Sequence, residues 1–278
     1  KSTDWDTEEH AVFEARRMKA LSTSEERHRV AARLQLPDLG PRKDYGISLR
    51  GPAATDADDV LRARWRVGLD LGAMYAEHAT AFDLLSRPAP FPGGVQAQVV
   101  ATLPEPIPEQ SILETWRKAI ANAHSFIYIE DQYFRMPILD EAIATALADN
   151  PALTLVVVTK PVTASDGGKK YTIEADERFR AVAPDRYLLL QLKVFEAVPR
   201  YPPITPGDEV DQFYFQSMDT HSKILIVDDE YLSVGSCNKN NRGLLYEGEL
   251  NASVWDATWV RDARRRIYRN LVGPEFAP

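Results

Sequence analysis

Apolar and polar residues alternate along this chain with two periods, one typical of strands and one typical of helices. Short apolar runs predict buried strands, and apolar residues three and four positions apart predict helices that cover a sheet. We expect strands at 46–50, 95–102, 125–130, 153–158 and 187–195. Helical patterns lie within 8–34 and at 55–65, 109–124, 137–149, 172–182 and 256–269. This alternation predicts an α/β fold, a layered α-β-α sandwich around a mixed sheet.

Two proline-rich segments interrupt the pattern: 87–94 (RPAPFPGG) predicts a linker and 198–208 predicts a loop. The strand and helix expected near 46–65 also have an internal echo near the C-terminus, where Ala257 and Thr258 occupy the places of Ala54 and Thr55. The echo suggests two equivalent half-domains. We therefore expect residues 1–92 to be the remainder of a first half-domain and residues 93–278 to be the second.

The stretch HSKILIVDDEYLSVGSCN at 221–238 holds the most chemistry. Its continuous apolar run predicts a strand buried on both faces. Alternate residues of a strand share a face, so His221 and Lys223 are expected to project together, with Asp228 on the other side. A lysine can hold the non-bridging oxygens of a phosphodiester, and an imidazole can donate or accept a proton near neutrality. The pair therefore predicts phosphodiester chemistry.

Other polar residues of this stretch have less definite roles. Ser236 and Asn238 lie two residues apart and are expected on one face, where Asn238 can donate to a phosphate or hold Lys223. Ser236 can equally form a turn. Asp228 is interpreted as structural, an acceptor of hydrogen bonds beyond the strand end. Cys237, the single cysteine, is interpreted as a small buried filler.

The H-x-K-x4-D run with its G-S-x-N tail resembles the signature of the phospholipase D superfamily. The segment FIYIEDQYF at 126–134 is similar to the IYIENQ(Y/F)F strand of true phospholipases D. The segment EGELN at 247–251 stands where that family has D-S-E or N-S-E. Near the N-terminus, DWDTEEH at 4–10 resembles the RWDTxEH segment that follows the family's first motif. The resemblance implies the phospholipase D fold.

In that superfamily two H-x-K motifs meet, and the first histidine attacks phosphorus while the second acts as the acid. By resemblance His221 is the second, and the first motif is expected to precede Lys1. A catalytic histidine needs a carboxylate on its other nitrogen. We expect Glu249 in that position, with Glu247 as the second choice and Asp6 in the same role for the first histidine.

Glu130 and Gln132 follow the apolar run of the 126–134 segment and are candidates for substrate binding, although ordinary packing at a strand end would also explain that segment. The mechanism implied by the resemblance requires no metal and no cofactor. The implied partners are a phospholipid at a membrane surface and the half of the protein that holds the first motif.

Composition changes this prediction in two respects. The 278 residues have a net charge of −8, and an acidic chain is a poor partner for nucleic acid. No apolar stretch approaches the roughly 20 residues of a membrane-spanning helix, and the start KSTDWDTEE is no signal peptide. The setting that we expect is a secreted, periplasmic or target-delivered enzyme at the membrane periphery, such as a bacterial toxin.

The resulting prediction is a phospholipase D that hydrolyses glycerophospholipids, or transfers their phosphatidyl group, through a phosphohistidine. Two alternatives stay open. One is another superfamily phosphodiesterase, either a cardiolipin-type synthase or a nuclease. The other is a half that is inactive without its partner segment.

Overall fold

The computed structural model describes residues 42–72, 87–163, 166–199 and 211–273. The helical patterns within 8–34, the segment 4–10 with Asp6, and most of the proline-rich loop at 198–208 lie outside these ranges. In the part that is described, no helix is long and apolar enough to cross a lipid bilayer.

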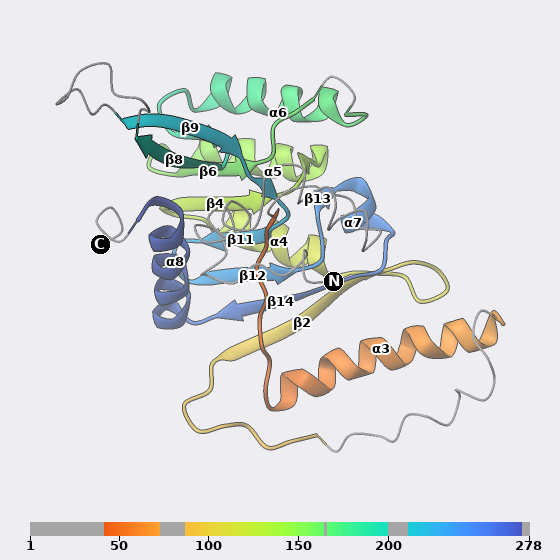
Figure 1. Cartoon of the computed structure of the whole chain (residues 1–278). Helices are drawn as coiled ribbons and strands as arrows, with labels where there is room; N and C mark the ends of the chain where they lie inside the picture. The colour runs from red at the N-terminus through yellow and green to blue at the C-terminus, as the bar shows by residue number, and fades with distance from the viewer. Residues whose placement is uncertain (1–41, 73–86, 164–165, 200–210, 274–278) are drawn as a thin grey trace, which may run out of the picture.

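The described residues form an eight-stranded sheet in the order β3-β2-β14-β12-β11-β4-β6-β7 (Figure 1). Its strands are β2 (Gln96–Leu103), β3 (Glu109–Gln110), β4 (Phe126–Asp131), β6 (Thr154–Thr159), β7 (Tyr187–Leu190), β11 (Lys223–Val227), β12 (Tyr231–Gly235) and β14 (Glu249–Trp255). The pairs β4–β6 and β6–β7 are parallel, and the other pairs are antiparallel. The predicted mixed sheet is therefore confirmed.

Helices cover both faces of this sheet (Figure 1). On one face, α4 (Ser111–Ala121), α5 (Pro137–Asp149) and α6 (Lys169–Val182) bury Trp116, Ile143 and Phe179 against alternate strand residues such as Ile127 and Leu225. On the other face, α8 (Ala257–Val272) buries Val260 and Ile267 against the residues between them, such as Tyr128, Ile224 and Ile226. Side chains of the central strands thus point alternately into two hydrophobic cores, one on each face of the sheet, as the predicted α-β-α sandwich requires.

The remaining elements connect or flank this sandwich. Helix α3 (Pro52–Asp70) packs against β2, and α7 (Asn241–Leu245) is a short helix that follows the motif. Three two-stranded sheets lie outside the large sheet. They are β1 (Arg42–Lys43) with β10 (Asp219–Thr220), β5 (Phe134–Arg135) with β13 (Lys239–Asn240), and β8 (Lys193–Pro199) with β9 (Asp211–Ser217).

Several predicted boundaries need correction. The strand expected at 46–50 is wrong: only Arg42–Lys43 pairs, with β10, and the chain beyond it finds no neighbouring strand among the described residues. Helix α3 begins at Pro52, earlier than expected, because proline is preorganised for the first helical position. The strand expected at 187–195 divides into β7 and β8. The linker at 87–94 has neither helix nor strand, as predicted. The division into half-domains near residue 92 stays a prediction.

Candidate functional site

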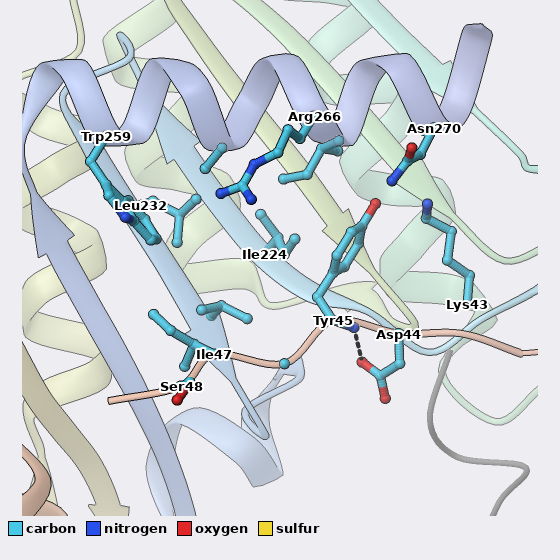
Figure 2. Close-up of a pocket in the computed structure, with 14 residues that line it drawn as sticks. Lys43, Asp44, Tyr45, Ile47, Ser48, Ile224, Leu232, Trp259, Arg266 and Asn270 are labelled. Atoms are coloured by element: carbon cyan, nitrogen blue, oxygen red, sulfur yellow. Dashed lines mark hydrogen bonds between the residues drawn. The ribbon is translucent and has the colours of Figure 1, made fainter. Parts of the chain in front are cut away.

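His221 lies just before β11, and its imidazole is held by a residue distant in sequence. Its Nδ1 is 2.6 Å from Oδ2 of Asp44, and its backbone N–H donates to the carbonyl of Lys43 at 2.7 Å. The other oxygen of Asp44, Oδ1, accepts the Tyr45 N–H at 2.9 Å, which fixes the carboxylate (Figure 2). With Nδ1 engaged, Nε2 is the ring nitrogen left to exchange a proton with a substrate.

Sequence reasoning missed Asp44 and placed Glu249 in this position. In the structure Glu249 instead accepts a short hydrogen bond from the Ser236 hydroxyl, and Glu247 forms an ion pair with Arg242. The internal echo held a signal that could have found Asp44. Asp44 precedes Ala54 by the same number of residues as Glu247 precedes Ala257, so the two carboxylates are equivalent in the repeated pattern.

Lys223 lies in the same charged region. Its side chain is almost fully buried, and its ammonium donates to the backbone carbonyl of His221. Burial lowers the pKa of Lys223, while the negative charges of Asp44, Asp131 and Glu249 act in the opposite direction. The histidine and the lysine of the motif therefore share Asp44 as a neighbour, and the expectation that they lie together agrees with this geometry.

A second buried lysine, Lys239, was not anticipated. It is 1% exposed, and its Nζ lies 3.1 Å from Oδ2 of the fully buried Asp131 and 3.1 Å from the Ile224 carbonyl oxygen. The same ammonium stands 4.4 Å from the ring centroid of Trp116. Burial raises the pKa of Asp131, and the charges of Lys239 and Lys223 oppose that rise. The ion pair fixes the chain that follows the G-S-x-N tail beneath the site.

Glu130 does not face the candidate phosphate position. It is fully buried and accepts three hydroxyl donors: Ser222 at 2.6 Å, Tyr128 at 2.7 Å and Tyr45 at 3.1 Å. The expectation of direct substrate binding by Glu130 is thus corrected, because its oxygens are already occupied inside the protein. Its hydrogen bond to Tyr45 instead anchors the residue next to Asp44. Gln132 is half-buried, and its backbone N–H donates to the Ser222 carbonyl at 3.1 Å.

The two polar residues in the tail of the motif differ in burial and in hydrogen bonding. Ser236 is exposed, and besides contacting Glu249 its hydroxyl accepts the Leu250 N–H at 3.0 Å. Asn238 has a buried side-chain oxygen that lacks a hydrogen-bond partner within the described ranges. A buried polar atom of this kind is unfavourable until something pairs with it. Substrate contact therefore stays a prediction for both residues, with Asn238 the stronger candidate.

Asp228 lies at the opposite end of β11 from His221. Its carboxylate accepts three backbone N–H groups, those of His124 at 2.5 Å, Ser125 at 2.7 Å and Phe126 at 2.8 Å. Its own backbone adopts a φ of 55°, in the left-handed region that aspartate tolerates better than most residues. These contacts agree with the structural interpretation of Asp228. The spacing of the motif thus places His221 and Asp228 at opposite ends of one strand.

A cavity of about 570 Å³ lies behind Asp44 (Figure 2). It is enclosed by residues 43–48, by strands β11 and β12, and by helix α8, and its lining is mainly apolar, with Ile47, Ile224 and Ile267 among the residues. His221 and Lys223 do not line it. The cavity is therefore adjacent to the orienting carboxylate but separate from the phosphate position.

The family model described as "Cardiolipin synthase, PLD-like domain" matches residues 116–270, more than half of the chain. The chain belongs to the phospholipase D superfamily. This membership confirms the resemblance of the H-x-K motif. At the coarse level it supports a phosphodiesterase-type enzyme.

Curated relatives agree with the family model. The probable cardiolipin synthase YwiE of Bacillus subtilis is 28% identical over 227 residues, which are 81% of this chain and 38% of that protein. Cardiolipin synthase 2 of Staphylococcus epidermidis is 31% identical over 62 residues, 22% of this chain and 13% of that protein. The chain thus spans between 13% and 38% of the length of these relatives.

Solved structures of the superfamily are also similar to this chain. Phosphatidylserine synthase of Haemophilus influenzae matches with a TM-score of 0.45 and 14% identity, over 70% of this chain and 41% of its own. Nuc of Salmonella typhimurium, a phospholipase D family member, matches with a TM-score of 0.40 and 16% identity, over 63% of this chain and 94% of its own.

Proposed function

We propose that this chain supplies the second catalytic half of an enzyme that transfers a phosphatidyl group to an alcohol, a synthase of the cardiolipin type. The observation that supports the proposal is the pairing of His221 with Asp44 beside the buried Lys223. The family description and the curated relatives favour this alternative over the hydrolytic phospholipase D of the main prediction. Both reactions share their chemistry up to the acceptor, which is water in one and an alcohol in the other.

The proposed reaction has two displacements. A histidine of the first motif, outside this chain, attacks phosphorus while the bond to the leaving alcohol breaks. Nε2 of His221 gives its proton to that alcohol oxygen. The acceptor alcohol then gives its proton to Nε2 and attacks phosphorus, which breaks the phosphorus–histidine bond and restores both imidazoles. General acid–base help of this kind contributes about 10²–10⁴ in rate.

The other residues hold charge and orientation in this scheme. Asp44 keeps the proton of His221 on Nδ1 when the ring is neutral and stabilises the imidazolium that forms. Lys223 faces the negative charge that develops on the phosphoryl oxygens. The pair of Lys239 and Asp131 holds the strand ends in place beneath them.

The test uses the intact protein with mixed phospholipid vesicles, a dissolved alcohol acceptor and, in parallel, duplex DNA. We expect phosphatidyl transfer to the alcohol and no cleavage of DNA. The variant His221→Ala should lose at least about 100-fold in kcat with an unchanged unfolding midpoint. The matched control is His124→Ala, because His124 is exposed and lies by Asp228 at the far end of β11.

Each other outcome contradicts a definite part of the proposal. Headgroup release without transfer would favour a hydrolytic phospholipase D, and cleavage of DNA alone would favour a nuclease. If His221→Ala lost activity only in proportion to lost folded protein, the assignment of His221 would be wrong. Activity that required addition of a polypeptide with a first H-x-K segment would support the proposed partner half.

A further inference from the structure

A second group of cations lies next to the candidate site and has no part in the reaction proposed above. The guanidinium carbon of Arg135 stands 4.0 Å from the centroid of the Tyr133 ring, and Nζ of Lys160 stands 4.2 Å from the same centroid. Both distances are typical of cation–π contacts. We name Tyr133, Arg135 and Lys160 the Tyr133 cluster.

The strand register places this cluster beside His221. Strand β11 pairs with β4 so that Lys223 is opposite Asp131, and the Gln132 N–H then donates to the Ser222 carbonyl at 3.1 Å. Tyr133 is the next residue of that chain. Strand β4 ends at the same edge of the sheet at which β11 begins, so Tyr133 lies at the edge that holds His221 and Lys223.

Lys160 reaches the same edge from the neighbouring strand. Strand β6 pairs in parallel with β4, with Thr159 beside Asp131, and Lys160 follows immediately. Lys223 and Thr159 are thus two strand spacings apart across the sheet, roughly 10 Å. A substrate that reaches both His221 and Lys160 must therefore span about this distance.

Positive charge exceeds negative charge in the Tyr133 cluster. Arg135 forms a short ion pair with Asp166, whose Oδ1 also accepts the Gly168 N–H at 3.0 Å. Burial opposes ionisation of Asp166, but that hydrogen bond and the charges of Arg135 and Lys160 outweigh it and lower the pKa of Asp166. One ionised carboxylate is therefore shared between two cations, and Lys160 makes no hydrogen bond or ion pair of its own in the ranges that the structure describes.

The inner site has the opposite balance. Asp44, Asp131 and Glu249 surround Lys223 there, and Lys239 and Lys43 are further buried lysines. Negative charge from protein side chains thus already offsets the inner lysines. The Tyr133 ring, in contrast, holds its two cations in place without neutralising them.

Backbone geometry fixes one of these cations more firmly than the other. A Cβ atom added to Gly168 would lie 1.7 Å from Nη1 of Arg135, so the guanidinium rests directly on bare backbone. The Arg135 side chain is consequently 16% exposed, whereas Lys160 is half-buried at the rim. The Arg135 side chain is therefore held in one position, and Lys160 is the cation able to turn towards a ligand.

We propose that the Tyr133 cluster is an anion subsite beside His221, which binds a second phosphate group of the substrate, in addition to the phosphodiester under attack. The inference rests on the proposed function and adds a substrate feature and the residues that select it. Lys160 donates to the oxygens of that second phosphate, and Arg135 adds its fixed positive charge. A substrate with one phosphate group leaves this subsite empty.

The test compares two substrates in the intact protein: a glycerophospholipid whose headgroup has a second phosphate group, and one with the same headgroup ending in a hydroxyl. The variant Lys160→Met should raise KM for the two-phosphate substrate about 10-fold or more, which is the effect of losing one charge-assisted hydrogen bond. Its kcat, and its KM for the hydroxyl substrate, should not change. Lys160→Arg should restore most of the affinity.

The matched control is Lys118→Met, an exposed lysine at the far edge beside the cavity that Asp228 lines. An equal KM for the wild type and Lys160→Met on the two-phosphate substrate would refute the binding of a second substrate phosphate at this subsite. An equal rise on both substrates would also refute it, because Lys160 would then serve binding in general. Inactivity of the wild-type protein on every phospholipid would instead count against the proposed function.

Competition with inorganic phosphate tests whether the subsite binds a phosphate group of a lipid or a free phosphate ion. We expect it to compete with the two-phosphate substrate in the wild type and to compete more weakly in Lys160→Met. If Lys160→Met lost inhibition by phosphate but kept its KM for the two-phosphate substrate, the subsite would take the free ion and not the lipid.

Discussion

Replacing Asp44 with asparagine is the most direct test of how His221 works. In the structure Oδ2 of Asp44 lies 2.6 Å from Nδ1 of His221, and Oδ1 is held by the Tyr45 N–H. Asparagine has nearly the same shape and can keep the contact with Tyr45. It removes the negative charge that stabilises a protonated imidazole, and with its oxygen on the Tyr45 N–H it turns an amide NH2 donor towards Nδ1 in place of the acceptor Oδ2.

The expected loss can be worked from that single contact. A hydrogen bond between charged groups is worth about 1.5–3 kcal/mol, and each 1.36 kcal/mol is a factor of ten in rate. In the proposed reaction the imidazole is charged before it donates its proton and again after it accepts one from the acceptor alcohol, so losing the charge of Asp44 should slow the proton-transfer steps and the loss should fall on kcat. We therefore expect Asp44→Asn to lower kcat by roughly 10- to 150-fold. Little change in the urea midpoint should accompany it, because both side chains are partly exposed.

Steady-state kinetics of phosphatidyl transfer can decide between the two carboxylates considered for this role. The comparison variant is Glu249→Gln, which leaves Asp44 intact and removes the partner of Ser236. If Asp44→Asn kept the wild-type kcat while Glu249→Gln lost it, the orienting role would belong to Glu249. The contact seen in the structure would then have no catalytic meaning.

Two further predictions concern stability. Asp140 is 4% exposed and burial raises its pKa to about 7, partly opposed by the charge of Arg178, whereas an unfolded aspartate ionises near 3.9. Between these two pKa values the unfolded chain binds fewer protons than the folded one, so the free energy of unfolding should fall by about 4 kcal/mol as the pH rises from about 4 to 7. Urea titrations at several pH values would measure this fall. Asp140→Asn should flatten the profile, and a profile unchanged in the variant would contradict the assignment. Asp228→Ala should lower the free energy of unfolding by about 2–4 kcal/mol, since three backbone N–H groups lose their acceptor, while kcat per folded molecule stays at the wild-type value.

The sequence alone was sufficient for features that depend on local periodicity. The apolar run of β11 predicted its burial, and alternation correctly placed Asp228 away from His221. The same alternation, applied to β4, would have separated Glu130 from Asp131. Asp131 faces Lys223 and Lys239, whereas Glu130 faces the side covered by α8.

Features that depend on contacts between distant segments could not be predicted in this way. Asp44 and His221 are 177 residues apart, and no local pattern relates them. Lys239 is a second example, because a lysine is ordinarily expected at the surface. Its burial follows from the ion pair with Asp131, 108 residues earlier in the chain. A buried charge of this type is found from its partner and not from its own neighbours in sequence.

Three successive residues of the segment before α3 hold the H-x-K motif in place. The Lys43 carbonyl accepts the His221 N–H, Asp44 holds the imidazole, and Tyr45 bonds to Glu130 beneath the strand. Among the described residues, the orienting carboxylate of His221 thus comes from the part of the chain expected to belong to the first half-domain. The H-x-K motif places a histidine and a lysine at the end of a strand, but the carboxylate that holds the histidine comes from residue 44. Under the predicted division near residue 92, we expect docking of the two halves to orient His221 as well, and a displaced first half to leave the imidazole without the carboxylate on which its proposed acid–base role depends.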